Sequence, residues 1–294
     1  MARVTEPRIS PIAVSLASAT TADCLRDLER LPPEVGMAEI RLDLMRAFDV
    51  PQLVKESPLP LIVTCRAQRE GGRFEGGERE RLAILRTAYD SGCAFIDVEA
   101  DTLDVVAGWP GSPTRVIGSR HWYDRMPAAL PALYADLRDR CDVVKLTGMA
   151  TSAWDVLLML ELLRDATTPV IGIAMGELGV CSRILAPVFP RVLLTYGSTA
   201  ANAGTAPGQI TVDQMANIYG LHLVDASTRV FVHVVRDDAQ LRAAEAAQVS
   251  AAPGRELHVA LRAADAGDAA RLEAAVAGLD DDLVAIQPAH RGLS

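Results

Sequence analysis

Short apolar runs alternate with longer amphipathic stretches along most of the chain, up to about residue 220. The apolar runs have the length and composition of buried strands, and the stretches between them show the helical period. The predicted strands span residues 12–16, 38–42, 59–65, 94–99, 115–119, 143–146, 170–174 and 192–196. The predicted helices span residues 21–31, 50–56, 79–91, 128–140, 152–166, 179–185 and 211–221, and a helix within 101–113 is expected to be abbreviated or missing.

Eight strands, each followed by a helix or a short remnant of one, predict an α/β fold of the (β/α)8 TIM-barrel type. A doubly wound open sheet is the competing architecture. That fold commonly carries a G-x-G-x-x-G turn after its first strand, and this sequence has neither that motif nor a G-x-x-x-x-G-K motif. The barrel is therefore favoured.

The pattern changes after Leu223. Strands are predicted at 228–235, 256–261 and 283–287, with helices at 239–249 and 266–277. This β-α-β-α-β order indicates a small appended α/β unit and not a ninth barrel repeat. We expect two domains, residues 1–222 and 223–294.

Composition narrows the class of protein. Half of the 294 residues are hydrophobic and 23% are charged, which favours a large core. The net charge of −9 without a basic tract argues against nucleic acid or an anionic membrane as partner. No apolar run has the about 20 residues of a spanning helix, and the N-terminus lacks the apolar segment of a signal peptide. Five scattered cysteines without a CxxC pair suggest neither a disulfide framework nor a metal site, so a cytoplasmic protein is expected.

Arginine supplies nearly all of the positive charge. Of the 29 Lys and Arg residues only Lys55 and Lys145 are lysine, and Lys145 lies within an apolar predicted strand. An amine that can lose its proton becomes a nucleophile toward carbonyl carbon, whereas arginine stays charged. On this residue alone, a buried structural lysine explains the pattern equally well.

Ionisable groups gather where the predicted strands end. Reactive groups of a barrel lie at the carboxyl ends of its strands. A single polar side chain at the end of a strand usually makes a structural hydrogen bond. Polar or ionisable side chains at the ends of six strands together favour an active site. These groups are Glu39, Arg41, Asp43, Arg66, Glu70, His121, Lys145, Arg183 and Gln209. Alternation along the second strand is expected to place Glu39, Arg41 and Asp43 on one side.

Lys145 and His121 together suggest proton removal beside an imine. An iminium group makes an adjacent C–H acidic, and imidazole suits proton transfer at neutral pH. Glu70 could orient the imidazole. Arg41, Arg66 and Arg183 would hold an anion and, with burial, depress the pKa of Lys145.

A series of short motifs resembles the type I 3-dehydroquinate dehydratase family over roughly residues 10 to 220. The motifs occur in the order of that family and are highly specific in combination. They are Glu39-x-Arg41-x-Asp43, Thr64-x-Arg66-x-x-x-Glu70-Gly71-Gly72, Phe95-Ile96-Asp97-Val98-Glu99, Ser119-x-His121, Val144-Lys145, Met175-Gly176-x-x-Gly179-x-x-Ser182-Arg183 and Ala206-Pro207-Gly208-Gln209.

The resemblance implies a lyase of the shikimate pathway of aromatic amino acid biosynthesis. Lys145 would form a Schiff base with the C3 ketone of 3-dehydroquinate, and His121 would carry out a syn elimination of water to 3-dehydroshikimate. Arg183 would bind the substrate carboxylate. Other contacts would come from Glu39, Arg41, Arg66, Thr205 and Gln209. A homodimer is expected, with no cofactor and no metal.

Two departures from the family pattern affect the pocket. Thr205 replaces the usual serine and keeps its hydroxyl, so substrate contact is expected to persist. Trp122-Tyr123 follows the histidine where the family has Asp-Phe, which is expected to change the pocket wall.

The tail resembles a degenerate substrate-binding domain of shikimate dehydrogenase, the enzyme to which this dehydratase is fused in some organisms. The segments concerned are Thr228-Arg229-Val230-Phe231 and residues 283–290. A dimerisation or stability module explains the tail equally well. Neither alternative predicts dehydrogenase activity or an NADP site.

Two other functions compete with the dehydratase. A class I aldolase also uses a Schiff-base lysine in a barrel, but the arginine and the Ala-Pro-Gly-Gln loop fit a carboxylate substrate better. A non-catalytic sensor of quinate-like ligands would more naturally lack Lys145 or His121, and both are present.

Overall fold

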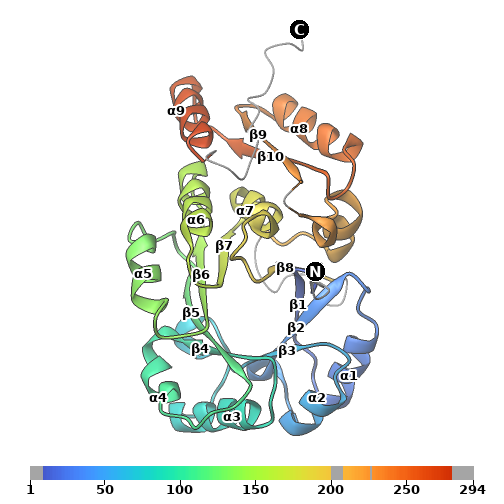
Figure 1. Ribbon diagram of the computed structural model, residues 1–294, viewed down its shortest axis with the longest axis vertical. Coiled ribbons are helices and arrows are strands. Elements are labelled where there is room, and N and C mark those ends of the chain that lie inside the picture. Colours follow the sequence, from blue (N-terminus) through green and yellow to red (C-terminus); the bar gives the residue numbers. More distant parts are fainter. Residues whose placement is uncertain (1–8, 200–207, 226, 280–294) are drawn as a thin grey trace, which may run out of the picture.

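The chain folds into a barrel of eight parallel strands, and the computed structural model describes residues 9–199, 208–225 and 227–279 (Figure 1). The strand order is β7-β6-β5-β4-β3-β2-β1-β8, and a parallel bridge between Val170 and Val192 closes the ring. The predicted (β/α)8 barrel is therefore confirmed. Its strands are β1 Ile12–Leu16, β2 Val35–Arg41, β3 Leu61–Thr64, β4 Phe95–Glu99, β5 Arg115–Trp122, β6 Val143–Met149, β7 Val170–Met175 and β8 Thr195–Gly197.

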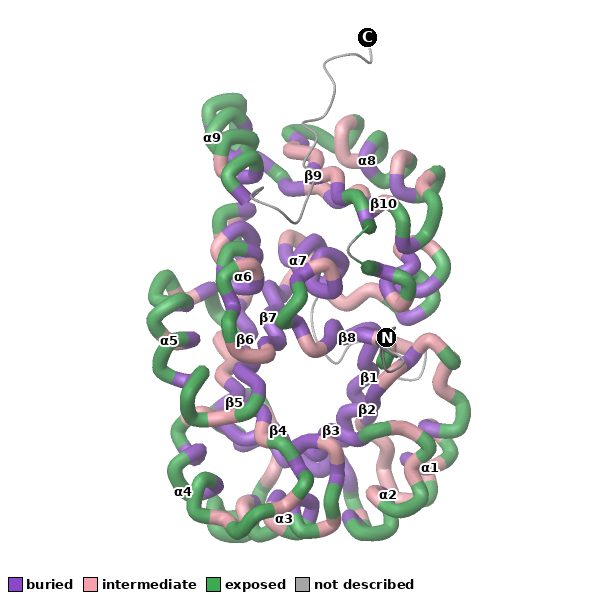
Figure 2. The backbone as a smooth tube through the Cα atoms, viewed as in Figure 1, coloured by how far each residue is buried: buried purple, intermediate pink, exposed green. Residues whose placement is uncertain are grey.

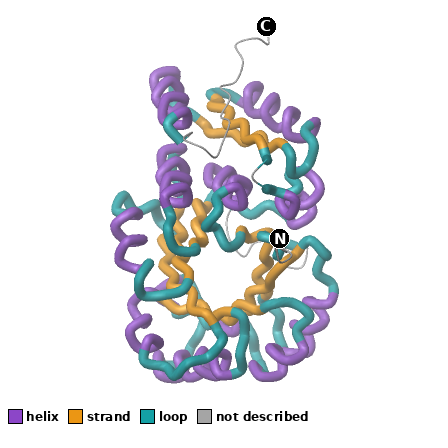
Figure 3. Tube along the Cα trace, viewed as in Figure 1, coloured by secondary structure: helices purple, strands orange, loops and turns teal. Residues whose placement is uncertain are grey.

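Helices surround the strands on the outside of the barrel (Figures 1 and 3). They are α1 Thr21–Glu29, α2 Val50–Glu56, α3 Glu78–Asp90, α4 Leu103–Ala107, α5 Leu130–Leu137, α6 Ala153–Asp165 and α7 Val180–Leu185. Polar residues begin several of them: Thr20 caps α1, Asp49 caps α2, and Ser152 with Asp155 forms a capping box on α6. The short α4 agrees with the abbreviated helix expected within 101–113.

The regular helix predicted at 211–221 is wrong. The chain there forms a π-helical turn at Gln214–Ile218, in which the Tyr219 amide donates to the Gln214 carbonyl oxygen at 3.1 Å. A 3-10 turn follows at Leu221–Leu223. Gly220, with φ of 63°, stops the helix because this left-handed conformation leaves the helical path.

The inward-facing side of several strands changes from apolar to polar along the strand. Residues such as Ile62, Phe95 and Ile117 pack together inside the amino end of the barrel, and a second apolar cluster lies between the strands and the helices. Much of the strand trace is coloured as buried in Figure 2. Two residues further along each strand, on the same face, stand Thr64, Asp97 and Ser119. The interior of the barrel is thus filled by apolar side chains at the amino end of the strands and carries polar and charged side chains at the carboxyl end.

Residues after the barrel form a second, smaller unit. It comprises β9 Arg229–Val235, α8 Asp238–Ser250, β10 Glu256–Arg262 and α9 Ala266–Ala277, with the two strands parallel. The strand predicted at 283–287 lies outside the described residues.

The second unit packs on α6 and α7 of the barrel (Figure 1). Trp154 Nε1 donates to Asp268 Oδ1 at 2.9 Å, and Arg164 Nη1 donates to the Gly278 carbonyl oxygen at 3.3 Å. Within the described ranges, no helix is long and apolar enough to cross a membrane.

Gly179→Ala is expected to destabilise the protein, because an added methyl carbon would lie 2.1 Å from the Ala174 carbonyl oxygen and force α7 away from β7. We expect a loss of about 1–3 kcal/mol in the free energy of unfolding, measured by urea denaturation. The control is Gly111→Ala, where no atom lies within 4 Å of the added carbon, and its stability should change by less than about 0.5 kcal/mol. Equal stability of the two variants would contradict the close packing of α7 on β7.

Candidate active site

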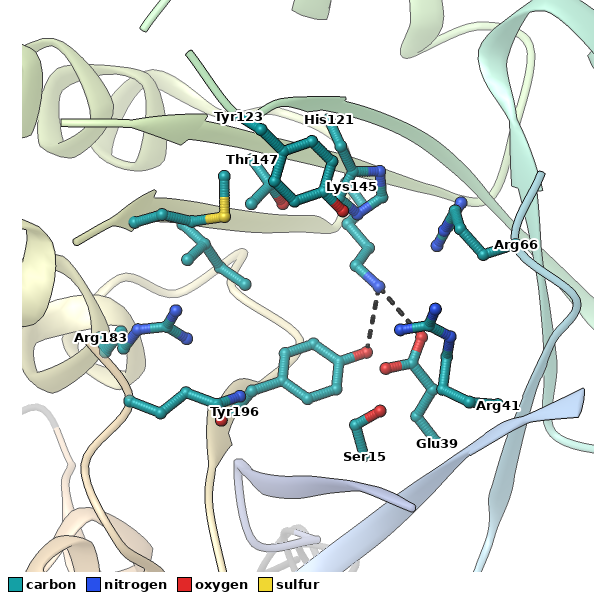
Figure 4. Close-up of a pocket in the computed structure, with 13 residues that line it drawn as sticks. Ser15, Glu39, Arg41, Arg66, His121, Tyr123, Lys145, Thr147, Arg183 and Tyr196 are labelled. Atoms are coloured by element: carbon teal, nitrogen blue, oxygen red, sulfur yellow. Dashed lines mark hydrogen bonds and ion pairs between the residues drawn. The ribbon is translucent and has the colours of Figure 1, made fainter. Parts of the chain in front are cut away.

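A pocket opens at the carboxyl ends of the barrel strands (Figure 4). The structure brings together seven of the nine predicted catalytic and substrate-binding residues, places Tyr123 in the wall as expected, and adds five more residues. Thr205 lies outside the described residues, and Glu70 lies behind His121. The lining residues are Ser15, Glu39, Arg41, Arg66, His121, Tyr123, Lys145, Thr147, Ile173, Met175, Arg183, Tyr196 and Gln209.

Lys145 projects from β6 into this pocket and is 4% exposed. Its Nζ lies 2.8 Å from Asp97 Oδ2 and 3.2 Å from Glu39 Oε1. Burial favours the neutral amine, but the two carboxylates outweigh burial and raise the pKa of Lys145 above its ordinary value. The expectation of a depressed pKa was therefore wrong, because Asp97 and Glu39 contact the amine directly and outweigh both burial and the arginines.

The same carboxylates define what this amine can do. In the free protein Lys145 is an ammonium ion, so Nζ must give up a proton before it attacks a carbonyl carbon. Once bonded to carbon as an iminium ion, the nitrogen would again be cationic and would remain beside Asp97 and Glu39. The site thus favours a cation at this position.

Asp97 is a functional residue that the sequence reasoning did not assign. Its carboxylate is fully buried on β4, where it accepts hydrogen bonds from Lys145 and from Ser119 Oγ at 2.6 Å, and pairs with Arg66 Nη2 at 2.8 Å. Burial raises the pKa of Asp97, but Arg66 and Lys145 outweigh it and lower the pKa below its ordinary range. The available signal was the alternation of Asp97 and Glu99 in an apolar strand, the pattern already noted for Glu39 and Arg41.

Arg66 connects the pocket to a buried ionic network. Its Nη1 donates to Glu99 Oε1 at 3.1 Å and to Ser119 Oγ at 2.7 Å. Arg81, from α3, pairs with the other oxygen of Glu99 at 2.6 Å. Buried charges of this kind are tolerated because each is paired and hydrogen bonded. Arg66 therefore lines the pocket in a fixed orientation.

Asp43 does not continue the side of β2 that carries Glu39 and Arg41, so that part of the alternation was wrong. The strand ends at Arg41, and Leu42–Leu44 forms a 3-10 turn. Asp43 instead accepts two hydrogen bonds from the Arg41 guanidinium, each 2.8 Å, and two more from backbone amides of the β3 loop. Its carboxylate therefore orients Arg41.

His121 stands at the end of β5 with Nδ1 2.9 Å from Glu70 Oε2. Burial lowers the pKa of His121 well below 6.5, and the Arg66 and Lys145 cations act in the same direction. Burial also raises the pKa of Glu70 to about 7. The imidazole is therefore neutral near pH 7 and able to accept a proton, provided that its tautomer is correct.

Tyr123 forms a wall of the pocket, as the departure from the family pattern suggested. Its ring stacks on His121 with centroids 6.2 Å apart, and its hydroxyl donates to the Glu70 carbonyl oxygen at 3.1 Å. Gly71 makes room for this ring, because a Cβ there would lie 2.8 Å from the Tyr123 ring. Trp122 packs against the outer apolar layer instead.

Arg183 reaches the pocket from α7, on the opposite side from Arg41 and Arg66 (Figure 4). Burial lowers the pKa of this guanidinium to about 10. An anion bound beside it would favour the charged form. Gln209 follows Gly208, whose φ of 70° and close approach to the Gly176 carbonyl oxygen fix the loop beside β7.

The arrangement combines an amine, a neutral imidazole and three guanidinium groups around one cavity. It suits an anionic ketone whose carbonyl carbon meets Lys145 while its negative group meets an arginine. In the described part of the chain, no cluster of three or more His, Cys, Asp or Glu side chains is arranged to hold a metal ion.

Solved structures agree with the barrel. The crystal structure of 3-dehydroquinate dehydratase from Geobacillus kaustophilus matches 72% of this chain and 89% of its own, with 25% identity and a TM-score of 0.61. The dehydroquinate dehydratase and shikimate dehydrogenase of S. pombe matches 96% of this chain and 57% of its own at 20% identity, with a TM-score of 0.60. The latter likeness concerns the fold alone.

Sequence relatives point to the same family. The bifunctional 3-dehydroquinate dehydratase/shikimate dehydrogenase of Arabidopsis thaliana is 34% identical over 206 residues, covering 66% of this chain and 34% of the relative. The 3-dehydroquinate dehydratase of Methanocaldococcus jannaschii is 29% identical over 217 residues, covering 71% of this chain and 98% of the relative. The sequence profile of type I 3-dehydroquinase matches residues 12–225, which include the lysine, the histidine and the arginines of the pocket. The chain belongs to the type I 3-dehydroquinase family.

Proposed function

We propose that this protein is a 3-dehydroquinate dehydratase that removes water from its substrate through a Schiff base on Lys145. The observation that carries the proposal is the position of Lys145 Nζ, which is buried in a pocket and held between Asp97 and Glu39. Membership of the type I 3-dehydroquinase family supports the same reaction. The step belongs to the shikimate pathway of aromatic amino acid biosynthesis.

The first stage joins the enzyme to the substrate. Lys145 Nζ loses a proton and attacks the C3 carbonyl carbon of 3-dehydroquinate, and the carbonyl oxygen leaves as water. The resulting iminium nitrogen stays beside Asp97 and Glu39, which stabilise its charge. The iminium group draws electrons from C2 and makes its protons acidic.

The second stage removes water from the ring. His121 takes a proton from C2, and the imidazolium then protonates the C1 hydroxyl as it departs, so that both events occur on one face of the ring. The C1–C2 double bond forms from the electrons of the C2–H bond. Hydrolysis of the iminium releases 3-dehydroshikimate and restores Lys145.

Substrate orientation is proposed to come from the arginines around the cavity. Arg183 pairs with the carboxylate, while Glu39, Arg41 and Arg66 meet the ring hydroxyls. Gln209 lies at the rim and contacts the bound substrate, together with Thr205, which is outside the described residues.

We also propose the division of the chain into a catalytic barrel, residues 1–222, and an appended unit, residues 223–294. The family profile ends at residue 225, close to this boundary. The appended unit is proposed to stabilise the barrel and to have no dehydrogenase activity. A homodimer in the cytoplasm is the expected state of the enzyme.

Borohydride reduction tests the covalent intermediate. Reduction in the presence of 3-dehydroquinate should add one ligand mass to the peptide that contains Lys145 and to no other peptide, measured by mass spectrometry. Lys145→Ala should remain unlabelled and lose turnover. His121→Ala should still be labelled, although its kcat should fall by about 10²- to 10⁴-fold, the usual contribution of a general acid or base. An active preparation in which Lys145 stays unmodified would reject the proposal.

Glu70 should determine the acidic side of the pH profile. Ionised Glu70 accepts the Nδ1 proton of His121 and leaves Nε2 free to take a proton, whereas protonated Glu70 donates to Nδ1 and enforces the opposite tautomer. Because the pKa of Glu70 is about 7, kcat/KM should rise as the pH increases through about 7. Glu70→Gln should lower kcat and remove this rise. An unchanged profile in that variant would assign the titration to another group.

A further inference from the structure

Tyr196 is a third partner of the reactive amine. Its hydroxyl oxygen lies 3.4 Å from Lys145 Nζ, and Nζ lies 4.9 Å from the centroid of its ring. The side chain projects from β8 across the cavity toward Lys145 and is 4% exposed (Figure 4). The proton transfers assigned to Lys145 and His121 leave this hydroxyl without a role.

The three partners of Nζ differ in whether they carry a proton. Asp97 and Glu39 are ionised, since the neighbouring cations outweigh burial and lower the pKa of each carboxyl group. Burial raises the pKa of Tyr196, so its phenol stays neutral. Ionised carboxylates only accept hydrogen bonds, whereas a phenol both donates and accepts. Among the described residues that are hydrogen bonded to Nζ, Tyr196 alone can therefore give a proton.

Schiff-base formation involves proton transfers that such a group can carry. An ammonium ion and a ketone become an iminium ion and water, so two protons leave nitrogen and both end on the departing oxygen. One C–N bond forms, it becomes a double bond, and both carbon–oxygen bonds break with their electrons retained by oxygen. No outside acid or reductant is needed, but the protons must cross from nitrogen to oxygen within the pocket.

We propose that the Tyr196 hydroxyl relays protons between Lys145 Nζ and the substrate carbonyl oxygen during formation and hydrolysis of the Schiff base. The phenol accepts a proton from nitrogen while it passes its own to oxygen, and it is neutral before and after each transfer. This role rests on the proposed function, because it presupposes a covalent intermediate on Lys145. Tyr123, the other tyrosine of the pocket, has its hydroxyl bonded to the Glu70 carbonyl oxygen.

Tyr196→Phe tests the relay because it removes the hydroxyl and keeps the ring. Rapid mixing with 3-dehydroshikimate, the reaction product, followed by a borohydride quench measures adduct formation without the elimination step. We expect the rate of adduct formation to fall by about tenfold or more in this variant. The matched control is Tyr89→Phe, whose ring packs edge-on against Trp109 outside the pocket, and it should form the adduct at the parent rate.

The outcomes separate the relay from the function on which it rests. If the parent protein forms no adduct at Lys145, the proposed function itself fails. If the parent is labelled and Tyr196→Phe is labelled equally fast, only the relay fails. The relay is also rejected if Tyr196→Phe turns over more slowly while its labelling rate is unchanged. The parent measured in heavy water gives a second readout that needs no variant. Adduct formation should be slower in heavy water than in ordinary water. Equal rates in the two solvents would contradict a proton transfer in the step that limits adduct formation.

Discussion

The buried contact of Lys145 with Asp97 and Glu39 is the interaction on which the site depends. Lone charges are very costly inside a protein, and each of these three is tolerated because the others are present. Asp97 is also bound to Arg66, and Arg66 to Glu99, which holds Arg81 from α3. The amine is therefore fixed by a chain of ion pairs that runs from the cavity through the barrel wall to a helix on its outside.

This arrangement explains how one residue can be both stable and reactive. Asp97 and Glu39 keep Lys145 protonated in the free protein. They would also stabilise the cationic iminium of the proposed mechanism. In the proposed reaction the nitrogen must therefore lose protons, but its positive charge lies beside Asp97 and Glu39 both before the attack and in the iminium. A neutral imidazole at His121 is compatible with this setting because burial, together with the surrounding cations, lowers its pKa.

The barrel could be predicted from the sequence because each strand and helix shows its own spacing of hydrophobic residues over a short stretch of chain. The carboxyl ends of parallel strands must then meet at one end of the barrel. Glu39, Arg41, Arg66, His121, Lys145 and Arg183 do meet there. The direct contacts of Lys145 with Asp97 and Glu39 could not be predicted in this way, because alternation places a residue on a face of a strand but does not say which side chains touch across 48 and 106 residues of chain. Because these contacts were not known, burial and the nearby arginines were expected to determine the pKa of Lys145, and the direction of its shift was predicted wrongly. The turn after β2 and the π-helical turn near Tyr219 were also predicted wrongly. They depend on single residues at the ends of elements, where the spacing of hydrophobic residues gives no information.

The hydrogen bonding between neighbouring strands is not the same at every position around the barrel. Seven of its joins are ladders between named strands, whereas β7 meets the chain before β8 through Val170 and Val192, with two hydrogen bonds at Val170. Local opening is easiest where the fewest bonds must break. α6 and α7 flank this seam, and α9 and β10 of the appended unit rest on them from outside. The appended unit therefore lies on the helices beside the one join of the described barrel that consists of an isolated bridge, next to the arginine that faces the pocket from α7.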